Sequence, residues 1–137
     1  MNEDENLRRY GLQPSAEDLD EVREMLAAQA TLEHRAQGDG DTELMKLCCV
    51  QLFNAGSLDD VLCIWQAKTS SFDAQCSIDV QLLCGAGLEE TKAHLSAANS
   101  GDASAALDYL LECEAAGDFV DFSVETASRW YAKYYLG

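Results

Sequence analysis

Along the chain, an apolar segment of seven or eight residues that ends at a glycine recurs with a period of roughly thirty residues. Residues 50–56 read VQLFNAG and are followed by SLDD, and residues 80–87 read VQLLCGAG and are followed by LEE. A looser third copy, LLECEAAG at residues 110–117, precedes an aspartate. A fixed period with a glycine between two apolar stretches is typical of stacked helical hairpins. The pattern therefore predicts a repeat architecture built from helices.

Apolar positions spaced three and four residues apart predict about seven helices, and no alternation with a period of two competes with them. Ser15, Ser57 and Ser123 are the expected N-cap residues, and Gly56 is expected to adopt a left-handed conformation at a helix end. The predicted elements are a first helix at about 15–36 and three hairpins at about 42–69, 73–99 and 102–136.

The predicted fold is all-α, a short right-handed stack of antiparallel helical hairpins, or α-solenoid, in the style of HEAT, armadillo, TPR or ankyrin arrays. It occupies residues 15–137 as one domain, and residues 1–14 are expected to be a flexible lead-in. The helix at about 73–84 is apolar around most of its circumference, so we expect it to lie centrally. Residues 80–87 resemble the second helix of an ankyrin repeat, but the Thr-Pro-Leu-His opening of that family is absent, so we assign no family.

The charge balance limits the kinds of partner that suit this chain. It has 25 Asp and Glu against 9 Lys and Arg, which is a formal net charge of -16. Such a field opposes binding to nucleic acid or to an anionic membrane, and it accelerates encounter with a basic protein. We therefore expect a basic protein partner and no nucleic acid or membrane partner. The acidic start of the sequence is unlike a secretory signal, so a cytoplasmic location is expected.

The six cysteines and two histidines predict no metal site and no nucleophile. All six cysteines lie in apolar helical stretches without Cys-x-x-Cys spacing, and His34 and His94 stand far apart in the sequence. Buried reduced thiols are the expected state, and no cofactor is expected. Acid–base catalysis needs two carboxyl groups in different environments, whereas the paired carboxylates of this chain are expected to be equally solvated. We therefore expect that the protein is not an enzyme.

Adjacent carboxylates recur just after each glycine of the repeat. In a stack, equivalent positions line up along one edge, so these side chains would form an acidic ladder suited to a basic ligand. A second interpretation is that first-turn carboxylates only stabilise their own helices, by about 0.3 to 1 kcal/mol each. The candidate partner-binding carboxylates are Asp59, Asp60, Glu89, Glu90, Asp118 and Asp121.

The last predicted helix interleaves aromatic side chains with two basic residues. Tyr131 and Tyr134 belong to its expected inner stripe, whereas Trp130 and Tyr135 lie on the opposite side. Because Trp and Tyr often dominate the binding energy of protein interfaces, we expect Trp130 and Tyr135 to be exposed anchors for a partner. Stacking on single-stranded nucleic acid suits this composition too, but the overall charge opposes it.

Two hypotheses about function follow from these patterns. In the first, the chain is an acidic helical-repeat module that masks a basic protein partner, as an immunity or inhibitor protein masks a toxin. The likeness to immunity proteins is one of size and charge and involves no shared motif. In the alternative, the chain is a scaffold or regulatory protein that docks a peptide, or self-associates as a homo-oligomer, through its aromatic C-terminal helix.

Overall fold

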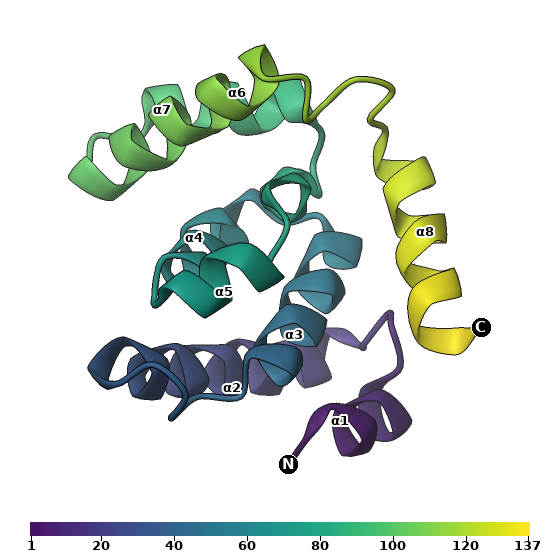
Figure 1. The fold of residues 1–137 in the computed structure, drawn as a ribbon. Coiled ribbons are helices and arrows are strands. Elements are labelled where there is room, and N and C mark those ends of the chain that lie inside the picture. The colour runs from purple at the N-terminus through teal and green to yellow at the C-terminus, as the bar shows by residue number, and fades with distance from the viewer.

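Eight α-helices and two short 3₁₀ helices, with no strand, make up the computed structural model, which describes residues 1–137 (Figure 1). The all-helical class predicted from the sequence is therefore confirmed. The α-helices are α1 (Glu3–Tyr10), α2 (Ala16–Arg35), α3 (Thr42–Ala55), α4 (Val61–Lys68), α5 (Phe72–Ser77), α6 (Leu88–Ala97), α7 (Gly101–Ala115) and α8 (Val124–Leu136), and the 3₁₀ helices are η1 (Leu58–Asp60) and η2 (Val80–Cys84).

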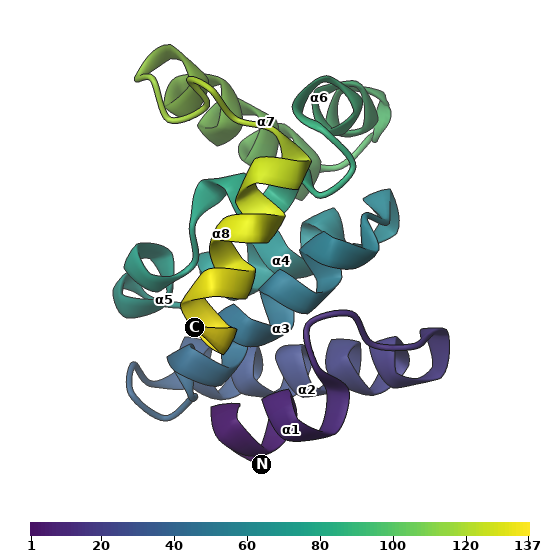
Figure 2. The ribbon, with the colours of Figure 1, turned by 90° about the vertical axis from the view of Figure 1, so that its right-hand side faces the viewer.

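The helices pack around one continuous apolar core. Helix α2 contacts α3 and α4, while α3 also contacts α1, α5 and η2. Helix α4 contacts α5 and α7, and α6 contacts η2 and α7. Figure 2 shows α8 crossing in front of α3 and α4, with α1 and α2 below it and α6 and α7 above it. The largest fully buried side chains include Phe53, Leu47, Leu82 and Leu110, which come from three different parts of the chain.

Several helix ends follow the predicted caps. The hydroxyl of Ser15 accepts a hydrogen bond from the backbone N–H of Asp18 at 3.3 Å, and the hydroxyl of Ser123 accepts one from Thr126 at 3.1 Å. Helix α3 ends at Gly56, whose φ of 72° lies in the left-handed region that favours glycine. The local signals for where these helices begin and end are therefore strong enough to be read from the sequence.

The glycines of the first two repeat copies lie against each other. A Cβ atom placed on Gly85 would lie 2.4 Å from the carbonyl oxygen of Phe53, and one placed on Gly56 would lie 3.2 Å from the carbonyl oxygen of Gly85. Only a residue without a side chain allows the first of these approaches. Gly85, two residues before the glycine that ends the second copy, thus allows the end of η2 to make backbone contact with the end of α3.

The predicted flexible lead-in, residues 1–14, instead contains helix α1, so this prediction is wrong. The amide of Asn6 is fully buried, and its Oδ1 accepts a hydrogen bond from Nε2 of Gln51 at 2.6 Å. The hydroxyl of Tyr10 donates to a carboxylate oxygen of Glu21 on α2, also at 2.6 Å. Besides these polar contacts, only Leu7 and Tyr10 of α1 pack on the core, which is too few apolar residues to form a stripe that the sequence pattern would show.

The helix predicted at about 73–84 is also wrong, because the chain breaks there into α5 and η2. The ammonium group of Lys68, which is buried, donates to the backbone carbonyls of Gln75 and Ile78 at the end of α5. Ile78 then adopts an extended conformation and ends the helix. The side chains of Ile78 and Leu82 are both buried. The apolar residues around most of the circumference of the predicted helix therefore belong to two short segments, each of which faces the core.

Helix α8 has a single buried residue, Tyr131, along its whole length. The ring of Tyr131 packs edge-on against Phe53 of α3, with 6.4 Å between ring centroids. Its hydroxyl donates to the carboxylate of Asp79 at 2.5 Å, and the Asp79 carboxylate lies 3.7 Å from the ammonium of Lys46. Tyr131 is therefore the main anchor of α8, and most of that helix faces solvent.

Candidate protein-binding surface

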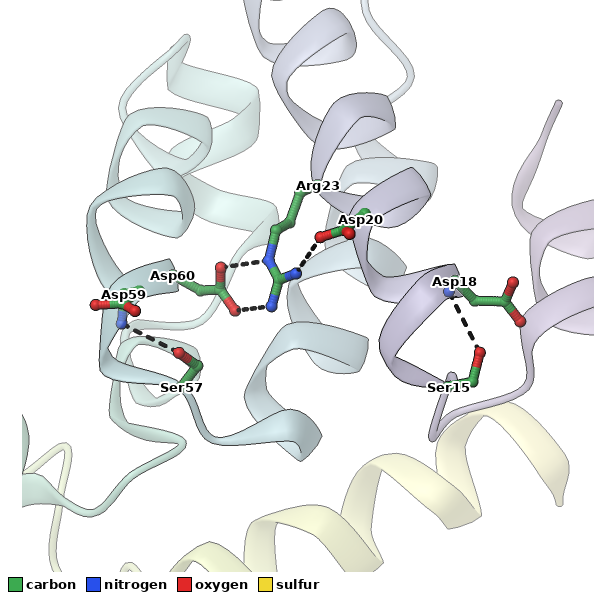
Figure 3. Close-up of polar contacts among 7 residues, drawn as sticks. All are labelled: Ser15, Asp18, Asp20, Arg23, Ser57, Asp59 and Asp60. Carbon is green, nitrogen blue, oxygen red and sulfur yellow. Dashed lines mark hydrogen bonds and ion pairs between the residues drawn. The ribbon is translucent and has the colours of Figure 1, made fainter.

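The start of α4 lies beside α2 and is joined to it by Arg23, which is about two turns into α2 (Figure 3). The guanidinium of Arg23 donates to both carboxylate oxygens of Asp60, from Nε at 2.7 Å and from Nη2 at 3.1 Å. Its Nη1 donates to Asp20 at 2.8 Å. The hydrogen bonds between Arg23 and Asp60 raise the pKa of the Arg23 side chain, although burial acts in the opposite direction.

The sequence analysis expected Asp60 to be a free carboxylate on the surface, and the structure shows that this is wrong. Its residue is only 4% exposed, and both of its oxygens accept hydrogen bonds from Arg23. Its neighbour Asp59 is exposed, and Figure 3 shows the Asp59 carboxylate on the other side of the chain from Arg23. Of this predicted pair, one member holds two helices together and the other is available to a partner.

The second predicted pair, Glu89 and Glu90, is exposed at the start of α6. Glu89 lies 3.0 Å from the ammonium of Lys92, which also binds Glu114 of α7 at 2.7 Å. Because Lys92 offsets part of the charge of Glu89, Glu90 is the freer of the two carboxylates.

Asp118 and Asp121 are both exposed in the segment between α7 and α8. The backbone carbonyl of Asp118 accepts a hydrogen bond from Nε2 of Gln81 at 2.7 Å, which attaches this segment to η2. Asp121 has a φ of 61°, a left-handed conformation that Asp tolerates better than most residues with a side chain. Asp118 thus has a fixed backbone and an exposed side chain.

The exposed aromatic pair of α8 is Trp130 with Tyr134, and not Trp130 with Tyr135 as predicted. Trp130 is 55% and Tyr134 is 57% exposed, and their rings stack with 5.6 Å between centroids. Tyr135 is half-buried and its hydroxyl is enclosed without a hydrogen-bond partner, so burial raises its pKa. Tyr135 follows Tyr131 by one helical turn and packs on the same side, which places Tyr134 on the exposed flank.

Asn54 of α3 links α8 to the segment that precedes α2, because it is hydrogen-bonded to both. Its Nδ2 donates to the carbonyl of Leu12 at 2.8 Å, just before α2 begins. Its Oδ1 accepts from the hydroxyl of Ser128 on α8 at 2.9 Å. The sequence offered no sign of this link.

The largest hollow of the molecule, of about 420 Å³, lies between α2 and α4 and contains both His34 and Cys63. Burial and the nearby charge of Asp60 raise the pKa of the Cys63 thiol, which favours its protonated form. Burial raises the pKa of Cys48 and of Cys84 to about 12. The expectation that every cysteine is buried is wrong for Cys76, which is exposed, and for Cys63, which is half-buried.

No three His, Cys, Asp or Glu side chains are grouped so that they could hold a metal ion. None of the helices has both the length and the apolar character needed to cross a membrane. Comparisons of this chain with protein-family models, with curated proteins and with solved structures find no match. The properties of its own surface are therefore the basis for a proposal about function.

Proposed function

We propose that this chain is an acidic helical-repeat module that binds and masks a basic surface of a protein partner, in the manner of an immunity or inhibitor protein. The proposal rests on the Arg23 ion pairs, which fix the start of α4 against α2 while Asp59 and Asp20 remain exposed. Carboxylates on helix starts that are already fixed lose little conformational freedom when a partner binds. The net charge of -16 would steer a basic partner toward them.

In this proposal, the helices form a short right-handed stack of antiparallel hairpins, an α-solenoid, and act in the cytoplasm. The backbone contact between Gly56 and Gly85 supports the stack, because it brings the ends of the first two repeat copies together. Asp59 and Glu90 then follow the glycines of neighbouring copies along one acidic edge.

Affinity capture from a cell extract at low and at high salt tests this function. We expect the wild-type chain to retain basic proteins at low salt and to release them at high salt, because exposed ion pairs are screened. Asp59→Lys should lower the retained amount. Glu112→Lys, an equal change of charge at an exposed site on α7, should lower it much less. Retention of only acidic or apolar proteins, or equal effects of the two variants, would contradict the proposal.

The exposed stack of Trp130 and Tyr134 favours a second candidate function. In this alternative, the chain is a scaffold or regulatory protein that docks an apolar peptide, or a second copy of itself, through α8. Two exposed aromatic rings held against each other form a rigid apolar surface of the kind that dominates binding at protein interfaces. Under this alternative, Trp130→Ala would abolish binding and Asp59→Lys would leave it intact. Loss of binding in Asp59→Lys supports the first function.

A further inference from the structure

Two adjoining hollows lie beside α8, and together they form one groove. The first hollow has a volume of about 340 Å³ and includes Asp79 in its lining, and the second has a volume of about 200 Å³ and includes Asp118. Gln81, Ala127 and Trp130 line both of them. The groove therefore runs between α8 on one side and η2 with the segment that precedes α8 on the other.

The walls of this groove are tied together. Nε2 of Gln81 donates to the backbone carbonyl of Asp118 at 2.7 Å, which joins η2 to the segment before α8. The hydroxyl of Tyr131 donates to Asp79 at 2.5 Å, which joins α8 to the residue that precedes η2. A partner would therefore meet a preformed groove, and little ordering of the protein would be needed on binding.

Every charged residue that lines the groove is acidic. Asp79 already accepts the hydroxyl of Tyr131 and lies 3.7 Å from the ammonium of Lys46, so part of its charge is offset. Asp118 is exposed and its carboxylate forms no ion pair, so its charge is free. The groove is thus complementary to a positive charge at the end where Asp118 lies.

Trp130 provides a fixed aromatic surface in the same groove. Tyr134 stacks on its indole, and Tyr131 packs edge-on against it with 5.0 Å between ring centroids. More than half of the Trp130 surface is nevertheless exposed, and Val120, which is 74% exposed, lies in the lining of the second hollow. A cation bound over an indole ring is attracted by the negative face of the ring.

We propose that this groove binds an arginine side chain of a protein partner, together with an apolar residue next to that arginine. The guanidinium stacks on Trp130 and donates to the carboxylate of Asp118, while the apolar neighbour contacts Val120. Arginine suits the site better than lysine because its flat group both stacks on an aromatic ring and donates to a carboxylate in a fixed geometry. This inference rests on the proposed function and specifies which chemical group of the basic partner is recognised.

Titration with a short acetylated and amidated peptide tests the proposal. The probe has the sequence Gly-Leu-Arg-Leu-Gly, and its control has Glu in place of Arg. Binding is followed by the NMR shift of the Trp130 indole N–H, with Trp65→Phe as the background so that one tryptophan remains. We expect the arginine peptide to shift this signal and the glutamate peptide to leave it unchanged.

Variants then locate the binding site of the peptide through the shifts of backbone amides around the groove. Trp130→Ala and Asp118→Asn should each weaken binding by about fivefold or more. Phe72→Ala, which removes an aromatic ring 75% exposed on α5, should leave the affinity unchanged. Circular dichroism of each variant shows whether it has folded, and both groove residues are exposed, so their removal should leave the fold intact.

Three results would overturn the proposal. They are equal binding of the two peptides, unchanged affinity in both groove variants, and a concentration-dependent dimer that buries Trp130 while the arginine peptide fails to bind. Capture of proteins by the wild-type chain separates this proposal from the wider function. If the wild-type chain binds the arginine peptide but shows no salt-sensitive capture of basic proteins, the groove is real and the masking function is wrong. If capture succeeds and the peptide does not bind, only the arginine site is wrong.

Discussion

Arg23 of α2 and Asp60 at the end of η1 form an ion pair with two hydrogen bonds, of 2.7 and 3.1 Å, that joins α2 to the start of α4. A carboxylate that is almost fully buried depends on such a partner, because the loss of its hydration is otherwise uncompensated. Asp59, the adjacent residue, has no ion-pair partner and is exposed. Two aspartates next to each other in the sequence thus have different physical roles.

Asp60→Asn should therefore lower the free energy of unfolding by about 1 to 3 kcal/mol, because the buried amide replaces a charged acceptor of the Arg23 guanidinium and leaves only Asp20 in that role. Asp59→Asn should change the same quantity by less than about 0.5 kcal/mol, as exposed substitutions usually do. Urea denaturation of both variants measures the difference. Equal effects of the two substitutions would show that the ion pair contributes nothing to stability.

Gly85→Ala should destabilise the fold by about 1 to 3 kcal/mol or more, because its methyl group would lie 2.4 Å from the Phe53 carbonyl oxygen. The φ of Gly85 is an ordinary -63°, so the cost comes from lack of space and not from backbone strain. Gly101→Ala is the matched control, since nothing lies within 4 Å of a Cβ atom there. It should leave the free energy of unfolding unchanged within about 0.5 kcal/mol, or raise it slightly. Thermal denaturation that ranks the two variants in the reverse order would contradict this view of the repeat contact.

Glu33 should make stability depend on pH in the acidic range. Its Oε2 accepts a hydrogen bond from the Ser71 hydroxyl at 2.5 Å, and its Oε1 accepts from the backbone N–H groups of Gly38 and Gly40 at 2.9 and 3.1 Å. Together these bonds lower the pKa of Glu33 below its ordinary value of 4.5 despite its burial, and the bond from Ser71 has the largest effect. The ionised form is favoured by folding, so this stabilisation is complete above pH 4.5 and is lost as the pH falls through the lowered pKa.

Glu33→Gln should accordingly reduce the acid sensitivity of the protein. At about pH 7 the variant should be less stable than the wild type by about 1 to 3 kcal/mol, and the difference should shrink as the pH falls below the ordinary pKa of a glutamate. Urea denaturation at a series of pH values measures both curves. Glu24→Gln, an exposed change on the same helix, should give a curve parallel to that of the wild type. Parallel curves for Glu33→Gln and the wild type would refute the assignment.

The helix starts at Ser15 and Ser123 and the end at Gly56 were predictable because a cap depends on a few adjacent residues. The break after Ser77 was not, because it is set by Lys68, which reaches the end of α5 from another helix. An apolar run cannot distinguish one buried helix from two shorter segments that both face the core. Local chemistry was therefore read correctly, and contacts made by distant side chains were missed.

The candidate surface was predictable to the same extent. Trp130, Asp59 and Glu90 are exposed as expected, since their types and positions favour a solvated face. The role of Asp60 depends on an arginine 37 residues earlier, and no pattern in the sequence indicates that pair. Tyr135 was misplaced because a helix attached through one tyrosine can turn so that either neighbouring aromatic residue faces inward.

Helix α1 should prove to be part of the folded domain and not a dispensable lead-in. Asn6→Ala leaves Nε2 of Gln51 with only the Gly11 carbonyl as an acceptor. Oε1 of the same Gln51 side chain is already buried without a hydrogen-bond partner. The expected cost is about 1 to 3 kcal/mol in the free energy of unfolding, measured by urea denaturation. Asn99→Ala, at an exposed site between α6 and α7, should cost less than about 0.5 kcal/mol. If the two variants are equally stable, or if removal of residues 1–10 leaves the unfolding midpoint unchanged, α1 contributes nothing to the fold and its buried polar contacts are not stabilising.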